Sequence, residues 1–368
     1  MVRDFFQTVD KSIFTGLGKS PDCLGNSMLI NKSKFPDLQN VDIAIVGLGK
    51  NADLFRKAFY TLSNRFAGIT IADLGNIRND KDKRNLAFGL TEVIIELIQL
   101  NICPLIIGEA DDYTTACTNA FTGQIDLAMV APRINTAEDS TLQQLMEMNK
   151  LFHLSLLTPQ TYFVAPDDIE AIESVFYETL RLGDFRADNT EAEPLLRQSD
   201  VFTFDTSAIK AGEFGASIKH FPNGLYNEEA CLLSRYAGIS NKISTALFYG
   251  FDLNKGLDTD AMQLAQMAWY FADGIDNRFN DNPDKNHPNF MVYTCHISKN
   301  QDIVFIKSLL TERWWMEIPV EAPAKKGKKI KSAKPTSVFI GCTANDFEIA
   351  KSGELPEKWY KAAGKLMN

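Results

Sequence analysis

Histidine and closely spaced cysteine are scarce in this sequence of 368 residues. It contains four histidines and six cysteines, and no two cysteines form the C-x-x-C pair that is common in zinc and iron–sulfur sites. The small number of histidines limits imidazole-based metal binding and acid–base catalysis. Widely separated cysteines in a chain of this length indicate reduced thiols, so we expect a cytoplasmic protein.

The chain also lacks an excess of positive charge and a long apolar run. A formal net charge of -9 and a sequence pI of about 5.1 argue against nucleic acid or an anionic membrane as the main partner. No apolar run approaches the roughly 20 residues of a membrane-spanning helix. The first residues include Asp4 and Asp10 and lack the apolar stretch of a signal peptide.

The sequence does contain short apolar runs that alternate with helical segments. We predict strands at residues 42–47, 69–73, 104–108, 127–131, 201–205 and 246–251. Their apolar residues are continuous, which is typical of strands covered on both faces. Apolar residues at helical spacing predict helices over residues 85–99 and from about residue 259. This order predicts an α/β fold with three layers, α-β-α, around a mainly parallel central sheet.

No linker divides the chain, so we expect a single domain over residues 1–368, with an N-terminal extension over residues 1–40. The one biased segment is 322–335, which contains six lysines and no acidic residue. We interpret it as a solvated loop, and contact with an anionic partner is the alternative. The tail that follows is predicted to form a short strand and a closing helix.

Polar side chains follow several of the predicted strands. They are Glu109, Asp111 and Asp112 after the third strand, Arg133 and Asn135 after the fourth, Asp205 and Ser207 at the end of the fifth, and Asp252 after the sixth. Ligands bind beyond the carboxyl ends of parallel strands. We therefore use the term mouth for the region at these strand ends where the residues are expected to meet. Carboxylates suit Mg2+, Mn2+ or Ca2+, whereas acids with an arginine also suit an ion-pair network without metal. Turn formation and helix capping are the structural alternatives for each residue.

Nucleophilic catalysis has little support in the sequence. His220 follows the polar cluster of the fifth strand and is a candidate to line the mouth, whereas we interpret His153 as a structural histidine. No G-x-S-x-G motif marks a nucleophilic serine, and Thr206 and Ser207 have no neighbouring base. These residues therefore give no catalytic assignment.

Four segments resemble, in order and spacing, the motifs of the ureohydrolase superfamily, which includes arginase, agmatinase and formimidoylglutamase. Residues 71–109 resemble the approach to a Gly-Gly-Asp-His motif, and LAMVAPRIN (127–135) stands where Asp-x-His-x-Asp belongs. TFDTSAIK (203–210) stands where Ser-x-Asp-x-Asp belongs, and FYGFDLNKGLD (248–258) resembles a later strand end of the family. Further stretches, such as LYNEEACLLSRYAGIS and RWWMEIP, resemble formimidoylglutamase-like proteins of Bacteroidetes-type bacteria.

The resemblance implies a metal site whose ligands have been lost. Active members of the superfamily hold two Mn2+ ions through His and Asp ligands. At the six matching positions this chain has Asp111 for His, Ala131 for Asp, Arg133 for His, Asn135 for Asp, a retained Asp205, and Ser207 for Asp. Asp252 stands where the family has the Glu that recognises the guanidinium or formimino group. If any metal binds, Asp111 and Asp205 are its expected ligands.

An arginine at this place changes the chemistry of the mouth. Arg133 stays protonated and cannot coordinate a cation. We therefore expect no metal cofactor. Because buried carboxylates need a counter-charge, we hypothesise that Arg133 pairs with Asp205 and with Asp111 or Asp112.

Our interpretation is a ureohydrolase-fold pseudoenzyme with a binding or scaffolding role. A small polar ligand would bind at the mouth beside Asp112, His220 and Asp252. The alternative is an active hydrolase of C–N bonds in amidines or guanidines that uses a rearranged Mn2+ site built from the remaining carboxylates. A third reading is the partner subunit of an active paralogue. The resemblance also implies a homo-oligomer, either a trimer or a hexamer.

Overall fold

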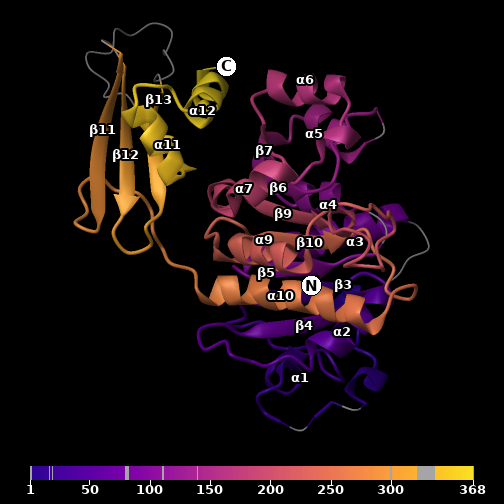
Figure 1. Cartoon of the computed structure of the whole chain (residues 1–368). Coiled ribbons are helices and arrows are strands. Elements are labelled where there is room, and N and C mark those ends of the chain that lie inside the picture. Colours follow the sequence, from indigo (N-terminus) through magenta and orange to yellow (C-terminus); the bar gives the residue numbers. More distant parts are fainter. Residues whose placement is uncertain are drawn as a thin grey trace, which may run out of the picture. The chain divides into compact units, whose positions relative to one another are not determined.

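The computed structural model describes residues 2–15, 17–18, 20–78, 83–109, 112–138, 140–298, 301–320 and 336–367 (Figure 1). The chain divides into two compact units. The first comprises Met1–Ile169 and Thr179–Phe279, and the second comprises Glu170–Glu178 and Asn280–Asn368. The single domain expected over residues 1–368 stays a prediction. The lysine-rich segment 322–335 lies outside the described residues.

A ten-stranded sheet forms the centre of the first unit, in the order β1-β4-β3-β5-β10-β9-β6-β7-β8, with β2 also paired to β4. Its strands are β1 Phe6–Gln7, β2 Leu29–Ile30, β3 Ile43–Gly47, β4 Ile71–Ile77, β5 Cys103–Ile107, β6 Ile125–Val130, β7 Leu151–Leu157, β8 Glu178–Leu180, β9 Val201–Asp205 and β10 Thr245–Tyr249. The pairings from β4 through β7 are parallel, and β1 pairs with β4 in the antiparallel sense. The predicted mainly parallel sheet is confirmed.

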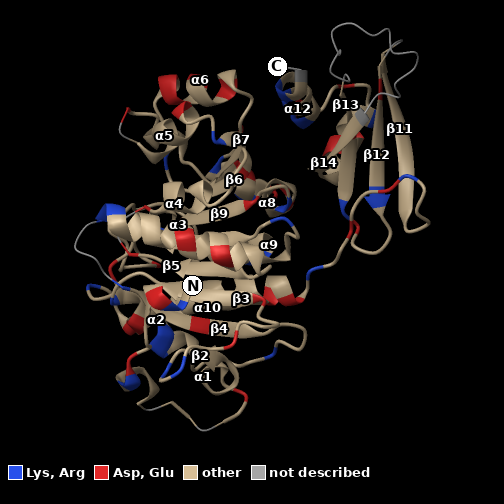
Figure 2. Cartoon of the chain, turned by 180° about the vertical axis from the view of Figure 1, so that it is seen from behind, with Lys and Arg blue, Asp and Glu red and all other residues tan. Residues whose placement is uncertain are grey.

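Helices cover both faces of this sheet. They are α1 Leu24–Ser27, α2 Asn51–Phe59, α3 Lys83–Gln99, α4 Thr114–Asn119, α5 Thr141–Glu147, α6 Pro166–Ser174, α7 Leu182–Ala187, α8 Ala192–Arg197, α9 Asn227–Ile239 and α10 Asp258–Asp276. Single 3-10 turns are η1 Val2–Phe5, η2 Lys11–Phe14, η3 Thr161–Phe163, η4 Asn189–Glu191 and η5 Thr206–Ala208. In Figure 1, α9 and α10 lie in front of the sheet, and Figure 2 shows α3 on the opposite face. This is the predicted three-layer arrangement. Within the described residues, no helix has the length and apolar character needed to cross a membrane.

Burial explains why the central strands have continuous apolar sequences. Every residue of β3, β5 and β10 is buried, since helices pack on both sides of them. The predicted strand over 246–251 ends earlier, at Tyr249, where Gly250 turns the chain with a φ of +86°. The predicted strand over 69–73 continues to Ile77, and β7 was not predicted at all.

The second unit contains a four-stranded sheet in the order β11-β12-β13-β14. Its elements are β11 Phe290–Ser298, β12 Gln301–Ser308, β13 Trp314–Val320, β14 Thr336–Cys342, α11 Ala344–Lys351 and α12 Glu357–Met367. All three pairings are antiparallel, and Phe305, Met316 and Ile318 form part of a separate core. The tail has two helices where one was predicted, because the chain turns at Gly353 with a φ of +91° before Pro356.

Candidate functional site

The order of the strands brings the predicted polar clusters together at the carboxyl-terminal ends of neighbouring strands. Strands β5, β10, β9 and β6 are consecutive neighbours and run parallel, so their carboxyl ends meet at the same side. Asp112, Arg133, Asp205 and Asp252 each lie at or shortly after one of these ends. Asp111 lies outside the described residues, so its expected part in the mouth stays a prediction.

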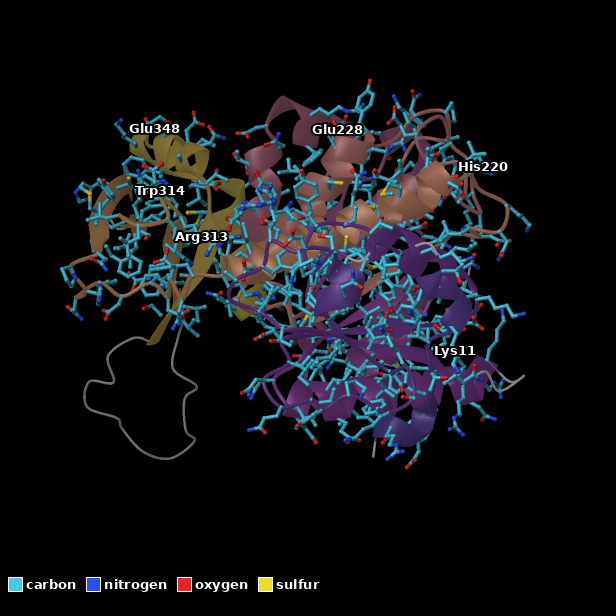
Figure 3. All side chains as sticks on the ribbon, turned by 90° about the horizontal axis from the view of Figure 1, so that it is seen from below. Lys11, His220, Glu228, Arg313, Trp314 and Glu348 are labelled. Atoms are coloured by element: carbon cyan, nitrogen blue, oxygen red, sulfur yellow. The ribbon has the colours of Figure 1, made fainter. Side chains whose placement is uncertain are left out.

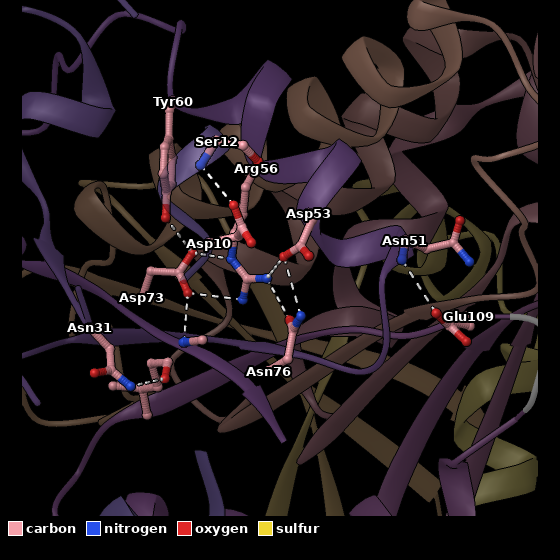
Figure 4. A network of polar contacts seen from close by, with 12 residues as sticks. Asp10, Ser12, Asn31, Asn51, Asp53, Arg56, Tyr60, Asp73, Asn76 and Glu109 are labelled. Atoms are coloured by element: carbon pink, nitrogen blue, oxygen red, sulfur yellow. Dashed lines mark hydrogen bonds and ion pairs between the residues drawn. The ribbon is translucent and has the colours of Figure 1, made fainter. Parts of the chain in front are cut away.

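Glu109, directly after Gly108, is held by backbone groups of two neighbouring turns (Figure 4). Its Oε1 accepts a hydrogen bond from the Asn51 backbone N–H at 3.3 Å, and its carbonyl oxygen accepts one from the Gly250 N–H at 2.7 Å. A Cβ at Gly49 would stand 2.0 Å from Glu109 Oε1, and Gly49 has a φ of +75°. Glycine is therefore required there, and the Glu109 carboxylate ties the turn after β3 to the turn after β5.

Asp112 lies just before helix α4 and bonds Thr114, the first residue of that helix. Its Oδ1 accepts hydrogen bonds from the Thr114 backbone N–H at 2.8 Å and from Thr114 Oγ1 at 2.5 Å. Burial raises the pKa of Tyr249 well above its usual value, and the negative charges of Asp112 and Asp205 add to this shift. The Tyr249 phenol therefore stays protonated and hydrogen-bonds to Asp112. Both interactions are structural.

Asp205 lies at the end of β9 in a largely buried position. Its Oδ1 accepts a hydrogen bond from the Ser207 N–H at 2.8 Å, and Ser207 is itself fully buried. A Cβ at Gly250 would stand 2.5 Å from this oxygen, so glycine makes room for the carboxylate. Burial raises the pKa of Asp205. Hydrogen bonding by Ser207 and the positive charge of Lys219 oppose that shift.

Arg133 does not form the predicted ion pair with Asp112 or Asp205, and pairing with Asp111, which lies outside the described residues, stays a prediction. Among the described residues, no acid lies within ion-pair distance of it, so pairing with Asp112 or Asp205 is wrong. The guanidinium carbon instead lies 4.9 Å from the ring centre of Phe221 and 5.6 Å from that of Phe163. Arg133 is exposed, so its charge stays hydrated while the aromatic faces attract it. A buried pair would have required its desolvation.

The remaining predicted residues have local roles or face solvent. Asn135 is exposed and its Oδ1 accepts a hydrogen bond from the Ala137 N–H at 3.1 Å, whereas Ala131 is buried. Asp252 pairs with Lys255 at 3.1 Å, and the hydrogen bond from that lysine lowers the pKa of Asp252. His220 is exposed.

The segment that carries His220 crosses the mouth. Ser217 forms an isolated antiparallel β-bridge with Phe251, and the Ile218 N–H donates a hydrogen bond to the Gly250 carbonyl at 2.9 Å, just after β10. The positive charge of Lys219 opposes the rise in the pKa of Asp205 at the end of β9. The Phe221 ring contacts the guanidinium of Arg133, which follows β6. The segment 217–221 therefore connects the ends of β10, β9 and β6, and this connection was not predicted.

A buried ion pair between α2 and the interior of β4 was also missed (Figure 4). Arg56 of α2 donates from Nε to Asp73 Oδ2 at 2.8 Å and from Nη2 to Asp73 Oδ1 at 3.0 Å, and neither side chain is exposed. The Tyr60 hydroxyl donates to Asp73 Oδ2 at 2.9 Å, and Arg56 Nη1 also bonds Asp53 and Asn76. An aspartate inside an otherwise apolar strand needs a counter-charge, and this signal in the sequence could have revealed the pair.

A groove of about 530 Å³ lies between α9 and α10 of the first unit. Glu228 and Tyr270 are among its lining residues, and no residue predicted for the mouth is. In Figure 3 Glu228 and His220 occupy separate places on the surface. The groove is therefore not the predicted mouth.

The described residues of the mouth do not fit a dinuclear Mn2+ centre. Asp112 and Asp205 each accept a backbone N–H, and the Ser207 and Ala131 side chains offer no anionic oxygen. Within the described part of the chain, no three His, Cys, Asp or Glu residues form a group that could hold a metal ion. A cation site needs converging oxygen or nitrogen ligands and no fixed positive charge beside it. The expected absence of a metal cofactor stays a prediction.

Neither the family models nor the curated proteins contain a match to this chain. Solved structures do match. Oxidized formiminoglutamase of Trypanosoma cruzi with Mn2+ has a TM-score of 0.63 at 15% identity, covering 70% of this chain and 100% of that one. Formimidoylglutamase of Bacillus subtilis has a TM-score of 0.61 at 13% identity, covering 71% and 94%. Agmatine ureohydrolase of Thermoplasma volcanium has a TM-score of 0.56 at 15% identity, covering 65% and 92%. The chain therefore has the ureohydrolase fold that its motifs predicted.

Proposed function

We propose that this chain is a ureohydrolase-fold protein that binds a small polar ligand at the mouth and does not hydrolyse amidines or guanidines through a dinuclear Mn2+ centre. The observation that carries the proposal is the position of Arg133. It stands at the sequence position of a metal-binding His in the family, and its guanidinium packs on Phe163 and Phe221. A permanent cation at that place opposes a second cation.

The carboxylates near Arg133 support the same proposal. Asp112 accepts a hydrogen bond from the Thr114 N–H and Asp205 caps η5, so each has a structural partner close to it in the chain. Hydrolysis at neutral pH requires a metal-bound water whose pKa is close to 7, and such a water needs a firmly held metal. Cytoplasmic location and homo-oligomeric assembly as a trimer or hexamer stay predictions from the sequence.

The test is a hydrolysis assay of the wild-type protein with added Mn2+. We expect no release of urea from arginine or agmatine and no release of formamide from formiminoglutamate. The matched control is the triple variant Ala131→Asp, Arg133→His, Asn135→Asp, which restores the family's ligand types at one strand end. Mn2+-dependent turnover by the wild type would refute the proposal.

The second candidate function is a hydrolase with a rearranged metal site. One observation favours this candidate. The negative charges of Asp112 and Asp205 both raise the pKa of the buried Tyr249 phenol, so the two carboxylates lie near one another. Asp111 and Asp252 would complete the set. This candidate predicts that wild-type turnover depends on Mn2+ and is abolished in Asp205→Asn.

A further inference from the structure

Among the described residues considered for the mouth, the exposed charged side chains are positive although the chain as a whole is acidic. Arg133, Lys219 and His220 are exposed. The acids nearby are partly withdrawn from solvent, because Glu109, Asp112 and Asp205 are each less exposed and accept backbone N–H groups. The groups that meet an incoming ligand are therefore mainly cationic or hydrogen-bond donors.

The contacts of Arg133 leave its donors available. Phe163 and Phe221 lie 4.6 Å apart, and both contact the guanidinium. An aromatic ring attracts a guanidinium through its face and accepts none of its in-plane N–H bonds strongly. Within the described residues no carboxylate lies within ion-pair distance of these N–H groups, and a planar guanidinium fork can bind two oxygens of one ligand.

Neighbouring contacts hold the aromatic support in place. The Tyr162 and Phe163 rings lie 4.7 Å apart, and the Tyr162 hydroxyl bonds Gln160 Oε1. The Gln160 N–H donates to the Pro132 carbonyl at 2.9 Å, and its Nε2 donates to the Asn223 carbonyl at 3.2 Å. Gln160 therefore links the turn that carries Arg133 to the loop that carries Phe221. This rigidity reduces the entropic cost of placing the guanidinium for a ligand.

We propose that Arg133 on its Phe163–Phe221 support is the binding group for a small oxyanion, with Lys219 supplying a second positive charge. This inference rests on the proposed function in placing the ligand at the mouth. A carboxylate and a phosphate share the required chemistry, since each offers two oxygens to the guanidinium fork. The anion binds where the fold's metal-dependent members have a cation-binding strand end.

The test is isothermal titration calorimetry in a phosphate-free buffer at low ionic strength, with succinate and inorganic phosphate as separate probes. We expect Arg133→Gln to weaken binding of the preferred probe by about tenfold or more, as for loss of a charge-assisted hydrogen-bonded pair. Arg133→Lys keeps the charge without the fork, so an intermediate loss is expected. Succinamide, a neutral analogue of succinate, is expected not to bind.

Arg181→Gln is the matched control, because Arg181 is an exposed arginine that pairs with Asp184 on α7. It is expected to bind as the wild type does. Preference for succinate or for phosphate identifies the source of the oxyanion. Equal binding by the wild type and Arg133→Gln, or no binding of either probe, overturns the inference. Neither result bears on Mn2+-dependent turnover, which tests the proposed function separately.

Discussion

At the scale of single residues, Arg133 is an exposed arginine that follows the buried end of β6. β6 pairs with β7 along its length and with β9 over Leu127–Val130, and Arg133 after its end contacts the rings of Phe163 in η3 and Phe221. The sequence predicts Arg133 at the mouth, and that assignment stays a prediction. It failed to predict the partners of Arg133, because Phe163 and Phe221 are far away along the chain and carry no charge.

Arg133→Gln is expected to leave the fold intact. Because the side chain is exposed and its guanidinium contacts two aromatic rings, the loss of unfolding free energy should be below about 1 kcal/mol. Urea denaturation followed by circular dichroism measures this change. A loss of several kcal/mol would show that Arg133 neutralises a buried acid after all.

Asp205→Asn is expected to stabilise the protein at neutral pH. Burial raises the pKa of Asp205 above its usual value of 3.8, so the folded chain binds this proton more tightly than the unfolded chain does. The carboxyl therefore costs stability as pH rises from 3.8 through the raised folded-state pKa. Asparagine keeps an oxygen for the Ser207 N–H and carries no charge.

Thermal melting of the wild type and of Asp205→Asn between pH 4 and pH 8 checks this expectation, because the raised pKa of a buried carboxyl lies within about this pH range. The Tm advantage of Asp205→Asn should be largest at pH 8 and shrink as pH falls. A constant difference across the series would show that the charge of Asp205 is not the cause. A lower Tm at pH 8 would show that the carboxylate is needed for stability.

At the scale of secondary-structure elements, the Arg56–Asp73 pair joins α2 to β4 inside the first unit. Burial acts to lower the pKa of Arg56, but the charge and hydrogen bonds of Asp73 raise it above the usual arginine value. Asp73 also receives the Tyr60 hydroxyl and the Gly75 N–H, so its oxygens are well satisfied. These buried polar groups therefore fix the position of α2 relative to β4.

Arg56→Leu is expected to destabilise the protein by about 3–5 kcal/mol, because it leaves the Asp73 carboxylate buried without its counter-charge. Arg181→Leu, which breaks an exposed pair, should cost about 1 kcal/mol or less. Chemical denaturation of both variants gives the comparison. If the two losses were equal, the buried pair would not be the structural link described above.

The elements themselves were predicted unevenly, for physical reasons. Strands such as β3, β5 and β9 are buried on both faces, so their apolar runs stood out in the sequence. β7 has a mixed burial pattern at its start, where Phe152 is exposed, and its run was not recognised as a strand. The antiparallel strands β11 and β12 mix exposed and buried residues, so continuous apolar runs do not mark them.

At the scale of the whole molecule, the sequence predicted the ureohydrolase fold, and structural likeness to formiminoglutamase and agmatine ureohydrolase confirms it. The boundary after Phe279 was not predicted, although the segment that follows it, 280–289, contains Pro283 and Pro288. Each unit has its own buried core, around the parallel sheet in one and around Phe305 in the other. The fold is thus retained while one strand end carries an arginine.

The central claim is that this strand end no longer supports a Mn2+ centre. Elemental analysis of wild-type protein, purified with Mn2+ present and then desalted, tests it most directly. We predict a Mn2+ content no higher than that of a protein without a metal site treated in the same way. The positive charge of Arg133 disfavours the ion, and the carboxylates of Asp112 and Asp205 already accept backbone hydrogen bonds. Stoichiometric Mn2+ retained by the wild-type chain would contradict the account.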